Sequence, residues 1–363
     1  MGVKIQELIH RTKLNFDQLQ KRVIAIDAPN IIFSFFTFSY KEKHINPANL
    51  IIDRTQRAIS HLYGILYRVN FYYSNQLLPI FCFDGRDSEL KRIISKDHLN
   101  DFRVVKKWYQ DALKSGNTAL AKKLSLGKEF LWPNIIEESK QLINDLGIPI
   151  LDSPASAESQ CAYLVKNNIA NYANSQDFDS LVFGCPFIIQ NLSKSLKRKV
   201  QGKWVYKKID PFLISLENNL KRLNINQFQL VDLAILIGTD YNQGVKNIGP
   251  KTALGLIKKY NNLEKIIYNK SSQYQFEHLT PKVIHEVRKI FLSPKVLEKF
   301  RDFYWDPPNR SQVIKLLCEN HNLNKERVDN NFKKLTQNYH KCIHTFKSKI
   351  PTKLFQKRLD MTY

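Results

Sequence analysis

Several features that define other classes of protein are missing from this chain of 363 residues. No apolar run approaches the roughly 20 residues that a helix needs to span a bilayer. The first residues form neither a secretory signal nor a myristoylation signal. The five cysteines are scattered and odd in number, so neither a disulfide framework nor a zinc site is indicated. The chain contains no internal repeat and no low-complexity tract, so a repeat architecture is not expected.

Acidic residues are also scarce. Asp and Glu number 33 against 56 Lys and Arg, which gives a net charge of +23 and a pI near 9.7. Such an excess indicates a polyanionic partner, either nucleic acid or an anionic membrane surface. The lack of a long apolar run makes the membrane the weaker choice. Apolar residues make up 43% of the chain, enough for a sizeable core, and the length suggests about two domains.

Four of the acids are placed at the ends of strand-like segments. Asp27 follows the β-branched run 22–26, Asp84 follows the apolar run 77–83, and Asp177 and Asp179 follow the run 169–173. Open α/β sheets present ligand-binding groups at the carboxyl ends of their strands. Two acids two residues apart point the same way along an extended chain, which is costly without a cation or a shared proton. The alternative is a solvated turn, because Asp and Ser favour turns.

Two more acids and a third strand complete this pattern. Residues 147–151 form another strand pattern, and the helix after it has Ser156 as N-cap and Glu158 in its first turn. Asp240 follows a helix over 227–237. Four strands alternating with helices predict a mostly parallel α/β sheet, on which these acids could converge at one edge. Mg²⁺ prefers carboxylates and water, and two such ions about 4 Å apart can support phosphodiester hydrolysis.

Other segments receive simpler predictions. Residues 1–21 show the pattern of an amphipathic helix with a short basic connection, residues 210–223 that of a second helix, and residues 197–199 that of the centre of a basic hairpin. The segment 86–128 mixes many lysines and arginines with aromatic residues, which predicts two basic helices joined near Gly116. They are either a solvated surface pair or a cationic arm that follows a phosphate backbone.

A glycine-rich turn follows the helix over 227–237. It runs from Gly244 to Gly249 before Pro250 opens the next helix, and Lys246 and Lys251 flank it. Backbone N–H groups at a helix start bind phosphate readily, so this turn favours nucleic-acid binding over an ordinary helix corner.

Together these motifs resemble those of flap endonucleases, the 5′ structure-specific nucleases of the XPG superfamily, and in particular the archaeal form. The similarity covers roughly residues 1–340. The segments that carry it are Val23-Ile24-Ala25-Ile26-Asp27-Ala28, Ser60-His61-Leu62-Tyr63-Gly64, Phe81-Cys82-Phe83-Asp84-Gly85, Ser175 to Gly184, and Leu236-Ile237-Gly238-Thr239-Asp240-Tyr241-Asn242.

The resemblance implies a PIN-like mostly parallel sheet flanked by helices, a helical arch and a helix–two-turn–helix element. It implies that Asp177, Asp179 and the arch residue Lys91 are catalytic, and that Phe33 stacks on a nucleotide. Two Mg²⁺ ions, replaceable by Mn²⁺, would be bound by Asp27, Asp84, Glu158, Asp177, Asp179 and Asp240. A K⁺ ion would bind at the helix–two-turn–helix element. DNA contacts would come from Gly2, Phe33, Arg68, Lys91, Arg92, Lys96, Arg103, Glu158, Gly238, Asp240, Gly244, Lys246, Gly249 and Lys251.

Three departures from the family pattern stand out. Ser156 replaces the first glutamate of the family's Glu-x-Glu, so one of the usual seven carboxylates is missing. His98 replaces the second arch cation, with Lys96 or Arg92 available to compensate. The sliding-clamp peptide at the end of the chain is degenerate: it is either a clamp ligand formed by Gln356, Leu359 and Tyr363 or a basic tail.

The resemblance divides the chain into five parts. Residues 1–85 and 134–260 form the nuclease core, with the helix–two-turn–helix near 238–260. Residues 86–133 form the arch, residues 261–340 a helical C-terminal part and residues 341–363 a tail.

The resulting functional prediction is a monomeric, Mg²⁺-dependent 5′-flap endonuclease with 5′→3′ exonuclease activity. It would process RNA primers and Okazaki fragments and take part in long-patch base excision repair, binding flapped DNA and the sliding clamp but no membrane. It would be intracellular: cytoplasmic in an archaeal host, nuclear in a eukaryotic one. The alternative is a structure-specific DNA-binding protein whose nuclease is weakened or lost through Ser156.

Overall fold

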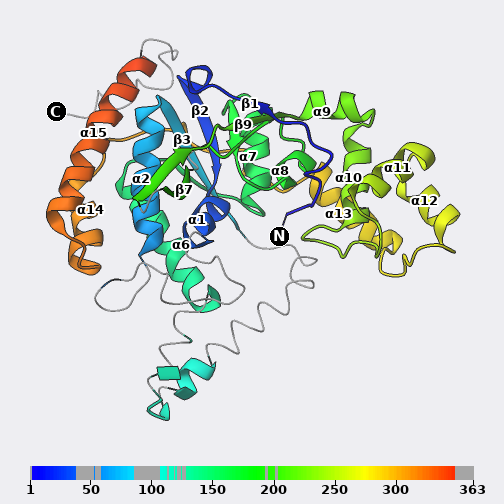
Figure 1. The fold of residues 1–363 in the computed structure, drawn as a ribbon, viewed down its shortest axis with the longest axis horizontal. Helices are drawn as coiled ribbons and strands as arrows, with labels where there is room; N and C mark the ends of the chain where they lie inside the picture. Colours follow the sequence, from blue (N-terminus) through cyan, green and yellow to red (C-terminus); the bar gives the residue numbers. More distant parts are fainter. Residues whose placement is uncertain are drawn as a thin grey trace.

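The computed structural model describes residues 2–37, 53, 59–85, 107–112, 114–117, 119–120, 124, 128–192, 195–200 and 203–347. A seven-stranded sheet lies at the centre of these residues (Figure 1), in the order β1-β9-β6-β5-β2-β3-β4. Its strands are β1 (Thr12–Lys13), β2 (Arg22–Asp27), β3 (Leu77–Phe83), β4 (Ile150–Asp152), β5 (Tyr172–Asn174), β6 (Phe187–Gln190) and β9 (Phe212–Ser215).

The central strands are parallel, as predicted. β2 pairs in parallel with both β3 and β5, and the parallel ladder continues to β4 on one side and β6 on the other. β9 closes the β6 side as an antiparallel strand and pairs in turn with β1. Parallel strands covered on both faces read as continuous apolar runs, which is the pattern of β3, where every residue is buried.

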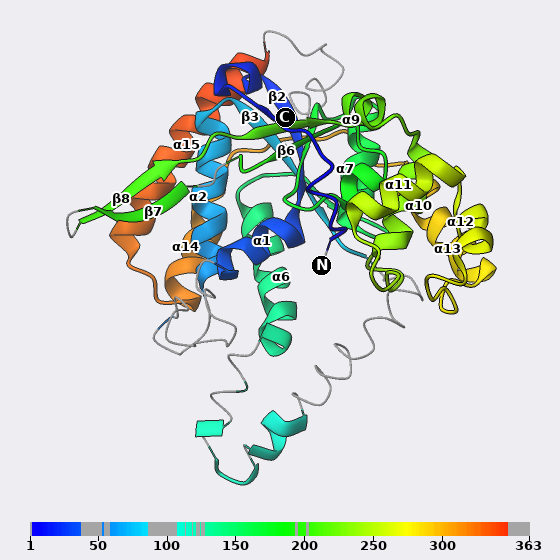
Figure 2. The same ribbon diagram turned by 45° about the vertical axis from the view of Figure 1, so that its right-hand side comes forward.

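Helices cover both faces of the sheet because of the order in which the chain visits the strands. The chain moves outward from β2 through β3 to β4, with α1 (Ala28–Thr37), α2 (Ser60–Ser74) and α6 (Lys128–Asp145) as connections. It then returns through α7 (Ala157–Lys166) to β5. Because such crossovers are right-handed, the outward and return helices lie on opposite faces. Figures 1 and 2 show α2 and α7 on the two sides of the sheet.

A helical lobe stands beside the sheet, on the right in Figure 1. It contains α10 (Gln227–Ile237), α11 (Pro250–Tyr260), α12 (Leu263–Lys270) and α13 (Pro281–Leu292). α10 also contacts α8 (Asp179–Val182), so the lobe touches the part of the sheet edge that carries Asp179. In the chain, α9 (Leu216–Leu223) connects β9 to α10.

An extended segment, residues 293–309, leads from this lobe back across the sheet. The Trp305 indole N–H donates to the Pro79 carbonyl at 2.7 Å, and the Asp306 N–H donates to the Gly147 carbonyl at 2.8 Å. The segment ends at α14 (Arg310–Ile314), which continues into the π-helical turn Lys315–Asn320. The last helix, α15 (Lys325–Lys347), follows this turn. α15 packs along α2 (Figure 1).

Two networks of ionic and hydrogen-bonding side chains stabilise these helices. In the lobe, Arg288 binds Asp232 (2.7 Å) and Glu264. Between α2, α6 and the π-helical turn, Glu138 accepts hydrogen bonds from His61 (2.9 Å) and His321 (3.1 Å), and His321 also contacts Asp53 (3.2 Å). Because carboxylates only accept, the His61 Nε2 atom carries the proton of its bond.

Three sequence predictions about elements are wrong. The described part of the segment 1–21, residues 2–21, forms a turn, β1 and a short 3₁₀ helix, Phe16–Leu19, instead of an amphipathic helix. Their backbone groups are bound by distant partners: the His10 N–H by Asn219 and the Leu14 N–H by the Pro211 carbonyl. The predicted helix over 210–223 begins only at Leu216, because residues 212–215 pair as β9.

The predicted hairpin exists as β7 (Ser195–Val200) and β8 (Lys203–Lys208), but residues 197–199 lie within β7 instead of at its turn. None of the helices in the described ranges is long and apolar enough to cross a membrane.

Candidate metal centre and nucleic-acid interface

The predicted acids lie around one end of the central strands. Asp27 is the last residue of β2, Asp84 directly follows β3, and Asp179 opens α8 shortly after β5. The chain leaves β2 toward β3 on one side and later returns to β5 on the other. This reversal of strand order is the switch point at which open α/β sheets bind ligands. The structure therefore places Asp27, Asp84 and Asp179 at the carboxyl ends of three neighbouring parallel strands.

Asp27 is buried at the centre of this edge. Its carboxylate accepts a hydrogen bond from the Ser175 hydroxyl at 2.7 Å and one from the Asn30 N–H at 3.3 Å. Burial raises the pKa of Asp27 to about 7, and the nearby charges of Asp84 and Asp177 contribute to the increase. A carboxylate that is this costly to ionise favours binding of a cation.

Asp177 and Asp179 lie together on the β5 side. The Asn30 side chain donates to Asp177 Oδ2 at 2.8 Å, and the Val3 N–H donates to Asp179 Oδ1 at 2.8 Å. Burial raises the pKa of Asp179 to about 7, with Asp240 and Asp177 adding to it, and burial also raises the pKa of Asp177. The positive charge of the chain's amino terminus lowers the pKa of each without reversing the shift.

The backbone at this pair differs from the prediction. Asp177 lies in a bend after β5 and Asp179 in the first turn of α8, so the two are not neighbours on one face of an extended strand. They nevertheless face a common point, because a Cβ placed on Gly2 would lie 2.9 Å from Asp177 Cβ and 3.2 Å from Asp179 Oδ2. The glycine at position 2 therefore lets the backbone pass directly beside both carboxylates.

The other side of the centre is formed by the start of α7. Asp84 Oδ1 accepts the Ala157 N–H at 2.8 Å, and Glu158 lies in the first turn of the helix. Ser156 is buried and caps α7, its hydroxyl accepting the Ser159 N–H at 3.2 Å. The Ser156 hydroxyl is thus used on the backbone at the start of α7. Asp152 does not replace the missing acid, because its exposed carboxylate pairs with Lys140 at 2.6 Å.

Asp240 approaches from the helical lobe. It lies in the turn after α10 and raises the pKa of both Asp177 and Asp179. The turn is tightly built: Gly238 has φ +107°, and a Cβ on Gly244 would lie 1.9 Å from the Ile237 carbonyl oxygen. Gly249 is the N-cap of α11 and Pro250 its first residue, as the sequence predicted for a phosphate-binding helix start.

The remaining predicted residues fall into two groups. Phe33 is 37% exposed on α1 and packs edge-to-face on Trp132, at 6.0 Å between ring centroids. The Arg68 guanidinium lies 5.3 Å from the ring centroid of Phe35. Lys246 and Lys251 are exposed on the turn before α11 and in its first turn. Seven predicted residues lie outside the described residues: Lys91, Arg92, Lys96, Arg103, Gln356, Leu359 and Tyr363.

Sequence reasoning missed the neutral groups that hold the acids. Asn30 and Ser175 each contact both Asp27 and the Asp177 segment. One signal was available: Asn30 stands one helical turn after Asp27, and Ser175 stands two residues before Asp177. The pairing of these two segments, however, depends on the order of the strands.

The donor set fits a hard divalent cation. All its groups are carboxylate oxygens, and burial raises the pKa of both Asp27 and Asp179, so a bound cation would favour their ionised forms. Within the described ranges, no group of three or more His, Cys, Asp or Glu side chains is placed so that it could hold one metal ion. Mg²⁺ retains several waters and uses one or two carboxylates together with phosphate oxygens, so a complete protein cage is not required.

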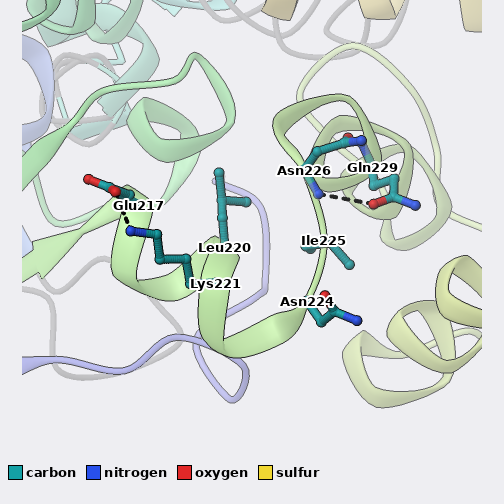
Figure 3. Close-up of a pocket in the computed structure, with 7 residues that line it drawn as sticks. All are labelled: Glu217, Leu220, Lys221, Asn224, Ile225, Asn226 and Gln229. Atoms are coloured by element: carbon teal, nitrogen blue, oxygen red, sulfur yellow. Dashed lines mark hydrogen bonds and ion pairs between the residues drawn. The ribbon is translucent and has the colours of Figure 1, made fainter.

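A shallow hollow of about 420 Å³ lies away from these acids, between α9 and α10 (Figure 3). Figure 3 shows the apolar side chains of Leu220 and Ile225 between two polar pairs. One is the ion pair of Glu217 with Lys221, and the other is the hydrogen-bonded pair of Asn226 with Gln229. It contains none of the predicted ligands.

Comparison with known proteins identifies the class. The XPG N-terminal domain matches residues 1–99 and the XPG I-region matches residues 147–240. A structure of flap endonuclease-1 from Methanococcus jannaschii superposes with a TM-score of 0.70, at 25% identity over 94% of this chain and 99% of that one. The catalytic core of Rad2, in complex with DNA substrate, has a TM-score of 0.62 at 20% identity over 92% of this chain and 99% of that one, which supports the fold. The chain therefore has the PIN-like fold of XPG-superfamily nucleases.

A full-length relative narrows this class. Flap endonuclease 1 of Archaeoglobus fulgidus is 35% identical over 335 residues, which is 92% of this chain and 96% of the relative. The chain belongs to the flap endonuclease 1 family. Members of this family are hydrolases that cut phosphodiester bonds and depend on divalent metal ions.

Proposed function

We propose that this flap endonuclease cleaves 5′-flapped DNA with two Mg²⁺ ions held at the carboxyl edge of its sheet. The observation that carries the proposal is the set of acids at the switch point, where Asp27 and Asp179 are both buried with pKa values of about 7. Asp27, Asp84, Glu158, Asp177, Asp179 and Asp240 would hold the metal. When bound, the ions lower the pKa of water and stabilise the charge on the leaving oxygen.

The chain's own residues keep the centre open and fixed. Ser175, Asn30 and the Val3 N–H orient three of the carboxylates by hydrogen bonds, and Gly2 leaves space beside two of them. Asp84 is oriented by the N-terminus of α7. None of these donors carries a charge that would compete with a cation.

DNA would be bound on both sides of this centre. The Gly244 to Gly249 turn presents the N-terminus of α11, with Lys246 and Lys251 exposed beside it, to the phosphates of a duplex arm. Phe33 is exposed one helical turn beyond Asn30 and would stack on an unpaired base. Lys91 would polarise the scissile phosphate, with Arg92, Lys96 and Arg103 guiding the flap.

Several finer features belong to the same proposal. They are 5′→3′ exonuclease activity, processing of Okazaki fragments, long-patch base excision repair, replacement of Mg²⁺ by Mn²⁺, a K⁺ ion at the helix–two-turn–helix turn, a monomeric state and a clamp contact through Gln356, Leu359 and Tyr363. The family supports the setting in replication and repair.

A labelled double-flap substrate tests the cleavage proposal. We expect cleavage at the flap base with Mg²⁺ and none with chelator, while Asp179→Ala removes cleavage and retains DNA binding. A Holliday junction and a blunt duplex serve as comparison substrates. Normal cleavage by Asp179→Ala would place the metal centre elsewhere, and preference for the junction would assign the chain another substrate.

A second candidate, a DNA-binding protein with a weakened nuclease, is favoured by one observation. Ser156 caps α7 with its hydroxyl, so it supplies neither a charge nor a fixed ligand. Ser156→Glu, measured as cleavage rate against Mg²⁺ concentration, separates the candidates. A rise of tenfold or more in rate or in apparent Mg²⁺ affinity would show a weakened site. An unchanged curve would show that the six acids suffice.

A further inference from the structure

The strands β2 and β5, which lead to Asp27 and Asp177, are joined by asparagine side chains at both ends. At the amino end of β2, Asn171 Oδ1 accepts the Val23 N–H at 2.9 Å. At the carboxyl end, Asn30 bridges the two segments: its side-chain NH₂ donates to Asp177 Oδ2 at 2.8 Å, and its Oδ1 accepts the Gln176 N–H at 3.0 Å. Its own backbone N–H donates to Asp27 Oδ1 at 3.3 Å.

Ser175 forms a second bridge between the same acids. Its hydroxyl donates to Asp27 Oδ2 at 2.7 Å and accepts the Asp177 N–H at 3.3 Å. The residue is completely buried, so water does not substitute easily for either bond. Asp27 and Asp177 are therefore linked twice, once through Asn30 and once through Ser175.

These bridges oppose an electrostatic force. The negative charge of Asp177 makes ionisation of Asp27 less favourable, so the two carboxylates repel each other whenever both are charged. A lysine or arginine in this position would relieve the repulsion, but it would also compete with a metal cation. A neutral amide and a neutral hydroxyl fix the spacing of the acids and leave their charge available.

We propose that Asn30 is a positioning residue that sets the spacing of Asp27 and Asp177 before the divalent ion binds, with Ser175 in a supporting role. The proposal rests on the metal centre proposed above. It assigns to Asn30 a contribution to metal affinity and to turnover, and none to DNA affinity, because its side-chain amide is used on Asp177 and Gln176 within the protein.

A purely structural role is the competing explanation, and Asn171 provides the matched control. Both asparagines join the β2 and β5 segments through side-chain hydrogen bonds, but Asn171 does so at the edge away from the acids. Loss of either bond should lower the melting temperature. Only loss of the Asn30 bonds should change metal binding.

The test uses the full chain and Mn²⁺ as the probe, with binding measured by isothermal titration calorimetry in the absence of DNA. The variants are Asn30→Leu, Ser175→Ala, Asn171→Leu and the reference Asp177→Asn. Asn30→Leu keeps the number and branching of the side-chain heavy atoms and removes the side-chain hydrogen bonds. Cleavage of a double flap is measured in parallel, with kcat and KM determined separately.

We expect Asn30→Leu to weaken Mn²⁺ binding about tenfold or more, since outer partners of metal ligands typically contribute 10- to 100-fold. It should lower kcat and leave KM for DNA within about twofold. Ser175→Ala should weaken binding less, and it carries the test if Asn30→Leu fails to fold. Asn171→Leu should retain wild-type Mn²⁺ affinity.

Different failures have different meanings. Wild-type Mn²⁺ affinity in Asn30→Leu together with weakened binding in Asp177→Asn would overturn the positioning role and leave the metal centre intact. An equal loss in Asn171→Leu and Asn30→Leu would also overturn it, because it would show a general effect of strand pairing. Unchanged affinity in Asp177→Asn would overturn the proposed metal centre itself.

Discussion

Buried and half-buried acids occur in two settings in this molecule, and the difference between them separates structure from function. Asp232 is paired with Arg288, and Glu138 with His61 and His321. At the sheet edge, no Lys, Arg or His among the described residues lies within salt-bridge distance of Asp27, Asp177 or Asp179. The first group is paired with charged side chains, whereas the hydrogen bonds to the second come from neutral donors.

The pKa values follow the same division. Burial alone would raise the pKa of Glu138, but hydrogen bonds from His321 and His61 lower it to about 2. Asp27 and Asp179 have pKa values of about 7, because burial is opposed only by weaker interactions. A buried acid whose ionisation is this unfavourable is an indicator of a functional site. An acid with a purely structural role is expected to have a charged partner.

The largest effect is expected where a compensated pair is broken. Arg288→Met leaves the fully buried Asp232 without its main partner, so we expect a loss of about 3–5 kcal/mol in the free energy of unfolding, measured in urea. Arg310→Met is the control, because Arg310 pairs with Asp329 at the surface and should cost under about 1 kcal/mol. Equal losses in both variants would remove the distinction between buried and exposed pairs.

At the sheet edge, we expect removal of a charge to increase the free energy of unfolding instead of lowering it. Asp179→Asn keeps an oxygen that can accept the Val3 N–H but removes a charge that Asp177 and Asp240 oppose. In chelator at pH 8, the variant should gain about 1–3 kcal/mol of stability, because one pKa unit corresponds to about 1.4 kcal/mol. Added Mg²⁺ should stabilise the wild type more than the variant. A clear loss of stability in chelator would show that the acid is compensated after all.

The smallest effect concerns pH and the histidine cluster. Burial lowers the pKa of His61 from its ordinary 6.5, so the unfolded chain binds a proton that the folded protein does not. Stability should therefore fall as the pH drops below 6.5, by at most about 1.4 kcal/mol per pH unit for this residue. Glu138 adds a second loss as the pH falls from 4.5 toward 2. Thermal melting from pH 7.5 to 5 would show the loss of stability that comes from His61.

His61→Gln checks that assignment. Glutamine can still donate a hydrogen bond to Glu138 but does not titrate, so the slope between pH 6.5 and 5 should flatten. A slope equal to that of the wild type would assign the acid sensitivity to another group.

Sequence patterns predicted the elements that depend on local signals. The bounds of β3 and α10 match the predictions, and Ser156 is the N-cap that its position before the helix indicated. The acids at strand ends could be predicted because parallel strands share one carboxyl edge. The failures are the segments whose partners lie far along the chain, such as residues 1–21 and β9, since no local pattern shows that a distant strand will accept their hydrogen bonds.

The same limit applies to the site. Asn30 and Ser175 were recognisable as polar residues near acids, but their joint role requires that β2 and β5 be neighbours, which depends on the order of strands. The backbone at Asp177 and Asp179 was predicted as extended and is a bend followed by a helix, because the apolar strand ends at Asn174.

The adjacency of β2 and β5 also has a consequence for how the protein acquires its activity during synthesis. Asp27 and Asp177 are 150 positions apart, and Ser175 joins them across 148. After β2 has been synthesised, the ribosome must still add nearly half of the chain before the proposed metal centre can form. The nascent chain therefore lacks the complete set of proposed metal ligands until Asp240 has been synthesised. If the protein is produced as two fragments, divided between β3 and α6, each fragment alone should lack nuclease activity. Activity should appear only after the two fragments associate.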